Sequence, residues 1–184
     1  MTGDKVTKKN IFQEKFGAPS GRAATKVVPY MIDWVQNFIR LSPFVVLATS
    51  DSDGNCDASP KGGRPGFVKI LDEQHLLIPD VAGNRLFQSY DNTSSNSRVG
   101  LLFMIPGEDC TARVNGTVEV VDKERLDAMN VEMEIFNPDD NSRIQQGLLL
   151  TVEEAYGHCP RAFKFSNLWD VETIQNNQRE PLAL

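Results

Sequence analysis

The strongest constraint on the fold is a succession of short apolar segments separated by turns, with few helical segments between them. The segments that predict strands are FVVLATS (44–50), a segment leading into the glycine-rich stretch at 57–71, GFVKILD (66–72), HLLIPD (75–80), RVGLLFMIPG (98–107), TARVNGTVEVVD (111–122), GLLLTVEEAYGH (147–158) and the shorter RAFKFS (161–166). Asp53-Gly54-Asn55 predicts a hairpin turn after the first of them. An alternating βαβ fold fits less well, because only one or two helices could serve as crossovers. The pattern favours a mainly antiparallel β-barrel of about six strands.

Three segments have the three- and four-residue apolar spacing of helices. They are 31–41, 83–92 and 123–136, and Asp122 is a suitable N-cap for the last. Residues 1–28 are polar and predict extended or irregular chain. We therefore expect a mainly β fold with peripheral helices, in which residues 1–29 form an N-terminal arm and residues 30–184 a single domain.

The charge of the chain argues against general nucleic-acid binding. The net charge is −6 over 184 residues, whereas nucleic-acid binding needs a basic surface. Residues 1–30 are an exception, with six cations and two acids, and a basic arm could contact nucleic acid or a membrane. A solvated arm that packs on the domain or on a partner subunit is favoured, so we expect neither partner.

The cysteines and histidines give no metal or disulfide pattern. Cys56, Cys110 and Cys159 lie far apart without a CxxC spacing, and His75 and His158 are the only histidines, whereas a zinc site needs about four ligands. The N-terminal sequence lacks the apolar stretch of a signal peptide, and no run approaches the ~20 apolar residues of a membrane span. We expect a cytoplasmic protein in a reducing compartment, with no bound metal.

The stretch DASPKGGRPGFVKIL (57–71) is unusually basic and glycine-rich for an acidic chain. It lacks the pattern of a P-loop, and its glycines precede a strand, unlike those of a dinucleotide-binding turn. Lys61 and Arg64 flank glycines that allow close approach of backbone N–H groups to a ligand. Residues 83–85 (GNR) are expected to open a helix, where a phosphate would be favoured. Each feature alone is also compatible with a solvated turn, and together they suggest an anion site.

The order of the segments resembles the pyridoxamine 5′-phosphate oxidase-like family of flavin-binding split barrels. The resemblance rests on SPKG, PGFVKILD, LLIPDVAGNRLFQSYDN, VGLLFMIPG and ARVNGTVEVVD, followed by HCPRAFKFSNLW, which is similar to the late segment of one uncharacterised branch. It covers roughly residues 30–170. It implies a six-stranded antiparallel split β-barrel that binds FMN as a homodimer, with the flavin between the subunits.

The resemblance also implies positions for cofactor-binding residues. Arg85 with Asn84 would hold the FMN phosphate, and Lys61 or Lys69 would add charge. The residues implied beside the flavin ring are Phe67, Val68, Pro79 and Asp80. Those implied from the carboxy-terminal part, across the dimer interface, are His158, Cys159 and Trp169. No residue is implied as a catalytic acid or base.

The carboxy-terminal sequence NNQREPLAL does not match the arginine-rich substrate motif of pyridoxamine phosphate oxidases proper. The resemblance therefore implies an FMN-dependent oxidoreductase that acts on a small molecule. The mismatch argues against pyridoxamine phosphate as that substrate, and the sequence does not identify another. A non-catalytic sensor or carrier module that binds flavin or haem is the alternative. A protein that binds nucleic acid or another partner through its basic arm is the third reading.

Overall fold

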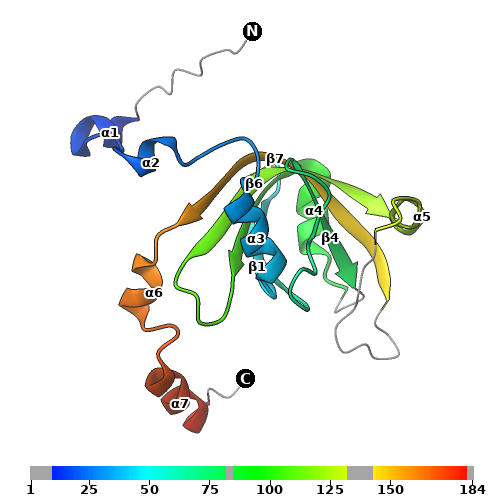
Figure 1. Ribbon diagram of the computed structural model, residues 1–184. Helices are drawn as coiled ribbons and strands as arrows, with labels where there is room; N and C mark the ends of the chain where they lie inside the picture. Colours follow the sequence, from blue (N-terminus) through cyan, green and yellow to red (C-terminus); the bar gives the residue numbers. More distant parts are fainter. Residues whose placement is uncertain (1–9, 82–84, 132–142, 182–184) are drawn as a thin grey trace.

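The computed structural model describes residues 10–81, 85–131 and 143–181. Figure 1 shows a curved sheet with helices α3 and α4 beside it and further helices at the two ends of the chain. The strands are β1 Phe44–Ser50, β2 Cys56–Gly62, β3 Lys69–Ile70, β4 His75–Val81, β5 Arg98–Met104, β6 Thr111–Asp122 and β7 Ile144–His158. The helices are α1 Ile11–Phe16, α2 Arg22–Thr25, α3 Asp33–Leu41, α4 Gln88–Ser95, α5 Lys123–Ala128, α6 Arg161–Ser166 and α7 Val171–Arg179.

The described strands form one antiparallel sheet in the order β2-β1-β5-β6-β7-β4-β3. The mainly β, antiparallel architecture with peripheral helices is confirmed. The six-stranded count is corrected: the sheet has seven strands and is open, with β2 and β3 at its edges. Within 66–72 only Lys69–Ile70 forms a strand, because Phe67 and Val68 turn into the core instead of pairing along an edge.

The hairpin between β1 and β2 is present as predicted. The carboxylate of Asp51 accepts hydrogen bonds from the backbone N–H groups of Asp53 and Asn55, both at 2.9 Å. Gly54 has φ 89°, a conformation that residues with a Cβ rarely adopt. The turn fixes the register of β1 with β2 over the whole length of both strands, from Phe44 opposite Gly62 to Ser50 opposite Cys56.

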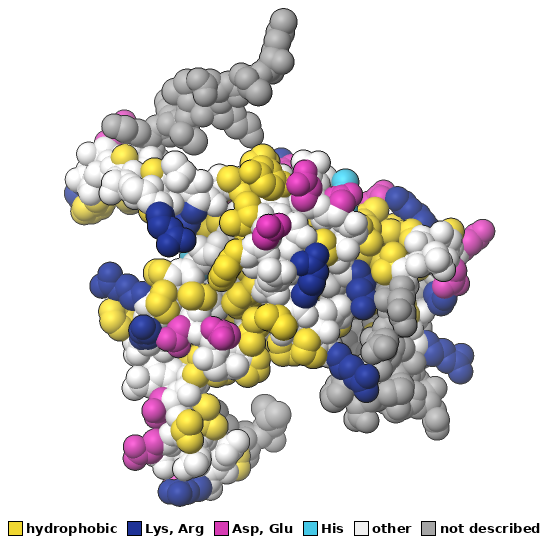
Figure 2. Space-filling view, in the orientation of Figure 1, with side chains coloured by type: hydrophobic (Ala, Val, Ile, Leu, Met, Phe, Trp, Pro, Cys, Tyr) yellow, Lys and Arg dark blue, Asp and Glu magenta, His cyan; other side chains and the backbone are white. Residues whose placement is uncertain are grey.

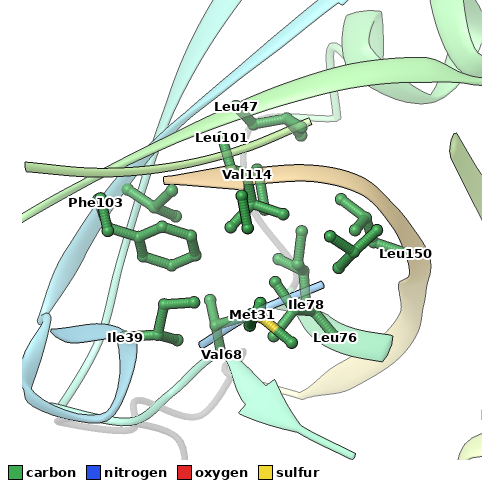
Figure 3. Close-up of a cluster of buried hydrophobic side chains, with 14 of the residues drawn as sticks. Met31, Ile39, Leu47, Val68, Leu76, Ile78, Leu101, Phe103, Val114 and Leu150 are labelled. Carbon is green, nitrogen blue, oxygen red and sulfur yellow. The ribbon is translucent and has the colours of Figure 1, made fainter. Parts of the chain in front are cut away.

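One face of the sheet closes around a hydrophobic core, into which helix α3 packs. Figure 3 shows side chains from several strands pointing toward one another, together with Met31 and Ile39. Helix α3 buries Val35, Phe38 and Ile39, whereas Trp34, on the predicted apolar stripe, is 45% exposed. Alternate residues of each strand supply the rest of the core, as expected for a sheet with one buried face.

The opposite face of β1 and β5 is also apolar. Phe44 lies opposite Met104 and Val46 opposite Leu102. These four side chains alternate with the buried ones, are half-buried, and do not belong to the core cluster. An outward face of an antiparallel sheet is usually polar where it meets water, so this face has the character of a contact surface.

Two predicted elements differ from the structure near the site and the carboxy terminus. Helix α4 begins at Gln88, not at 83, since Arg85 and Phe87 have φ of 62° and 51° and so lie outside the helical region. Residues 161–166 form helix α6 and not a strand. Pro160 precedes this helix as its N-cap residue, and proline is compatible with a helix start because it needs no N–H partner there.

Two further predictions are corrected, for residues 1–28 and for the helix expected at 123–136. Residues 1–28 are not wholly irregular: α1 begins with a capping box in which Asn10 and Gln13 bind each other's backbone N–H groups. Asp122 caps α5 as predicted, accepting from the N–H of Arg125 at 2.8 Å, but α5 ends at Ala128. Residues 129–131 of the predicted helix are not helical, and 132–136 lie outside the described residues.

The terminal segments extend away from the sheet. Figure 1 shows α1 and α2 on one side of the body and α6 and α7 below them on the same side. The arm is joined to the body where Val28 bridges Ala155 of β7. In the part of the chain that the structure describes, no helix is long and apolar enough to cross a membrane.

Gly116 provides a test of the sheet geometry. The pairing of β6 with β7 shifts register between Asn115 and Gly116, and a Cβ on Gly116 would lie 2.0 Å from the carbonyl oxygen of Thr151. We expect Gly116→Ala to lower the free energy of unfolding by about 1–3 kcal/mol, as overpacking typically does, in urea denaturation. Gly62→Ala is the control, since its Cβ would meet no atom closer than 3.5 Å. Equal stability of the two variants would contradict the close approach at Gly116.

Candidate functional site

A cavity of about 320 Å³ lies between the edge strand β2 and the end of β4, and we call this opening of the sheet the seam. It is lined by residues 57–61 of β2, residues 80 and 81 at the end of β4, and residues 85–90, which lead into and begin α4. Its volume falls within the range of small-molecule sites. Because β2 is an edge strand, one side of its backbone has no partner strand among the described residues, and that side is available to a ligand.

Strand β2 presents a polar row toward the inside of the sheet. Asp57, Ser59 and Lys61 are half-buried and alternate with exposed residues, and they lie opposite the buried residues of β1. A strand projects alternate side chains to one face. The row therefore places a carboxylate, a hydroxyl and an ammonium group along one wall of the cavity.

Asp80 connects the two sides of the seam. Its side chain is only 13% exposed, and its Oδ1 lies 3.8 Å from Nζ of Lys61. Gln146 Nε2 donates to Asp80 Oδ2 at 3.3 Å, and the hydroxyl of Tyr90 lies close enough to Asp80 for its pKa to respond to that carboxylate. The pairing of β4 with β7 becomes irregular after Asp80, and such irregularities often redirect side chains beside functional sites.

Tyr90 lies beside this carboxylate. Burial, followed by the charge of Asp80 and the hydrogen bond to it, raises the pKa of Tyr90 far above its ordinary value. The hydroxyl is therefore protonated at any physiological pH. A protonated phenol can donate to the Asp80 carboxylate, which stabilises a carboxylate that has lost most of its water.

Helix α4 is held in place by Asn92, one turn after the cavity. The Nδ2 group of Asn92 donates to Thr49 Oγ1 at 3.0 Å and to Asp57 Oδ2 at 2.8 Å. Both Asn92 and Thr49 are buried. The N-cap residue, Phe87, makes no side-chain cap, so the first-turn N–H groups of α4 lie at the cavity without a capping side chain.

The cavity gathers three of the residues implied by the resemblance, namely Lys61, Asp80 and Arg85. Asn84 lies outside the described residues. The other residues implied beside the flavin ring do not line the cavity: Phe67 and Val68 are buried in the hydrophobic core, and Pro79 is in β4. Lys69, implied as the alternative to Lys61 for added charge, is in β3 and does not line it. Arg64 does not line it either.

Sequence reasoning did not identify several cavity residues. These are Asp57, Ser59, Gln88, Ser89 and Tyr90. The polar alternation at positions 57, 59 and 61 is a local signal that could have identified the wall of β2. Ser89 and Tyr90 had no such signal, because they reach the cavity only in the folded chain.

A second cluster lies at the other end of β7. Arg113 Nη1 donates to Tyr156 Oη at 3.1 Å, and Lys26 Nζ lies 4.9 Å from the centre of the Tyr156 ring and donates to the carbonyl oxygen of Gly157. The ring of His158 lies 5.0 Å from that of Tyr156. His158 Nε2 is buried and has no hydrogen-bond partner within the described part of the chain.

The three implied carboxy-terminal residues belong to this end of the molecule and do not line the cavity. His158 ends β7, and Cys159 follows it and is exposed. Trp169 donates from Nε1 to the carbonyl oxygen of Glu108 at 2.9 Å and stacks on Phe163. Within one chain the structure therefore separates these residues from Lys61, Asp80 and Arg85.

The comparisons with known proteins agree with this architecture. Residues 31–159 match the model of the pyridoxamine 5′-phosphate oxidase family, and the chain belongs to that family. No curated protein matches the chain significantly.

Among solved structures, one similar chain is a Lactobacillus delbrueckii protein proposed to be a pyridoxamine 5′-phosphate oxidase. It is 24% identical, with a TM-score of 0.53, over 72% of this chain and 99% of that one. A variant of HupZ from Group A Streptococcus is 15% identical, with a TM-score of 0.51, over 70% of this chain and 99% of that one. At these identities the two structures support the fold alone.

The His158 cluster predicts a pH dependence of stability. Burial first, and then the charges of Arg113 and Lys26, lower the pKa of His158 below its ordinary value of 6.5. The unfolded chain therefore binds a proton at His158 more readily than the folded chain does. The contribution of neutral His158 to the free energy of unfolding is fully present above about pH 6.5 and is lost as the pH falls below that value. We expect His158→Gln to reduce the drop in melting temperature between pH 7.5 and pH 5.5. An unchanged drop would show that His158 does not contribute.

Proposed function

We propose that the chain binds FMN in the seam cavity and acts as an FMN-dependent oxidoreductase on a small molecule. The observation that carries this proposal is the convergence of Lys61, Arg85 and the start of α4 on one cavity. Lys61 comes from β2, whereas Arg85 and the start of α4 belong to one later segment, residues 85–90. Membership of the family supports a flavin as the ligand, and the cations at the cavity support a phosphate group on that ligand.

The chemistry of the cavity suits a phosphomonoester. Such a phosphate carries a charge of about −1.5 to −2 near neutral pH. The first-turn N–H groups and the dipole of α4 favour an anion, and Arg85 can add a charge-assisted hydrogen bond. Lys61 supplies a second cation from the facing strand.

FMN, when bound, supplies the electron-transfer chemistry, and the protein supplies position, electrostatics and access. In this proposal the polar row of β2 orients the ligand, and the free edge of that strand offers backbone donors and acceptors. Turnover of a reduced nicotinamide with an electron acceptor would distinguish an enzyme from a flavin carrier.

We further propose that the protein is a homodimer and that residues 30–184 form its flavin-binding domain, with 1–29 as an arm. The apolar outer face of β1 and β5 supports the homodimer, because a second copy of the chain would cover this face. Figure 2 shows hydrophobic side chains gathered over the middle of the visible face, between the two pairs of terminal helices. The apolar side chains of α1 are also exposed, Ile11 by 72% and Phe16 by 73%.

Arg85→Ala tests the phosphate role. We expect FMN affinity, measured by quenching of flavin fluorescence, to fall at least tenfold, because a charge-assisted bond to the phosphate is lost; hydrogen bonds to charged groups contribute about 1.5–3 kcal/mol. Riboflavin, which lacks the phosphate, should bind wild type and variant alike. The free energy of unfolding should be unchanged.

Arg179→Ala, on the exposed surface of α7, is the matched control and should bind FMN as the wild type does. FMN affinity that is equal in the Arg85 and Arg179 variants would contradict the role of Arg85. A wild-type protein that binds no FMN would overturn the proposed function.

Leu102→Lys tests the dimer. Leu102 lies on the apolar outer face of β5, opposite Val46, and a charge there should separate the subunits without disturbing the core. Sedimentation should show a dimer for the wild type and a monomer for the variant. Val120→Lys, at an already exposed position of β6, should remain dimeric. A wild-type monomer, or a dimeric Leu102 variant, would contradict this surface.

A further inference from the structure

The seam cavity contains carboxylates as well as cations. Asp57 and Asp80 line it together with Lys61 and Arg85. An anionic ligand is attracted by the cations and repelled by the carboxylates, so the arrangement of these four groups decides how strongly the cavity binds it. The two carboxylates have different surroundings.

Asp80 is the carboxylate that engages a cation. The ammonium group of Lys61 lies 3.8 Å from Asp80 Oδ1, and the Asp80 side chain is 13% exposed. A carboxylate removed from water in this way needs partners. Gln146 provides a neutral donor at 3.3 Å, and Lys61 provides the charge.

Asp57 is bound differently. Its Oδ2 accepts from the Asn92 amide at 2.8 Å, a bond that holds α4 on the β1–β2 hairpin. The cation of the same wall, Lys61, is four residues along β2 and points to Asp80 on the other side of the seam. Asp57 therefore serves to anchor the helix, and Asp80 is the group that competes for Lys61.

We propose that Asp80 is a built-in counter-ion that sets the affinity of the cavity for anions by competing with the ligand's phosphate for Lys61. Asp80 is a positioning residue, since it acts on the phosphate through Lys61. In the empty cavity Lys61 neutralises Asp80. When a phosphate binds, Lys61 is shared between the two anions, and the nearby charge of Asp80 lowers affinity for the phosphorylated ligand. The inference rests on the proposed function for the identity of that ligand as FMN.

Asp80→Asn tests this inference, because asparagine keeps the size and one acceptor oxygen while removing the charge. We expect FMN to bind about three- to tenfold more tightly, the effect of a partly solvated charge pair, and riboflavin to change by less than about twofold. In the background of Lys61→Met the gain should disappear, since the two residues act as one unit. Fluorescence titration of both flavins with the four proteins of this cycle measures all the affinities.

Asp109→Asn is the matched control. Asp109 forms a similar ion pair outside the cavity, with Lys164 at 3.9 Å, and its removal should leave both affinities unchanged. The inference is overturned if Asp80→Asn weakens FMN binding, if it changes both flavins equally, or if the gain persists without Lys61. Circular dichroism of each variant establishes that it is folded before it is titrated.

Failure of the proposed function gives a different result. If the folded wild type binds neither flavin, that proposal falls, and the role of Asp80 is then measured by calorimetry with inorganic phosphate. Tighter phosphate binding by Asp80→Asn, dependent on Lys61, supports the counter-ion role with another phosphate ligand. Unchanged or weaker phosphate binding overturns it.

Discussion

The two edge strands of the sheet, β2 and β3, are not paired with each other. Beyond the short β3, side chains rather than strand pairing connect β2 to the end of β4, and this opening is the seam. A buried or half-buried strand edge needs partners for its backbone groups, and here the opening contains a polar cavity. The ion pair between Lys61 and Asp80, at 3.8 Å, spans it. The position of the cavity, its charge and the approach of α4 all depend on this incomplete closure.

The anchoring of α4 is the second requirement of the site. Asn92 joins the helix to both strands of the first hairpin, through Thr49 and Asp57. Because both bonds come from one buried amide, the helix cannot shift without leaving buried polar groups unpaired, which costs about 1–3 kcal/mol for each group. The start of α4 and Arg85 are thereby held at the cavity. Hydrophobic packing positions the sheet, but polar bonds position the site.

Much of the fold could be predicted from local sequence, whereas the site could be predicted only in part. Strand 44–50 and strand 111–122 have the predicted bounds, because a continuous apolar run in the first and an apolar alternation in the second are local signals. The start of α4 was wrong by five residues, since Arg85 and Phe87 adopt left-handed backbone conformations that residue type alone does not indicate. Residues 161–166 were predicted as a strand because six residues are too few to distinguish the two periods.

The sequence by itself determined the class of fold, the antiparallel order of closely connected strands and the basic, glycine-rich character of 57–71. It also determined membership of the pyridoxamine 5′-phosphate oxidase family. Only the tertiary structure decided which of the cations serves the cavity: Lys61 lines it, while Arg64 and Lys69 do not. Alternation along a strand states which side chains share a face, but not which strand lies across an opening. That is why the pairing of Lys61 with Asp80, and the position of Tyr90 at the cavity, appear only in the folded chain.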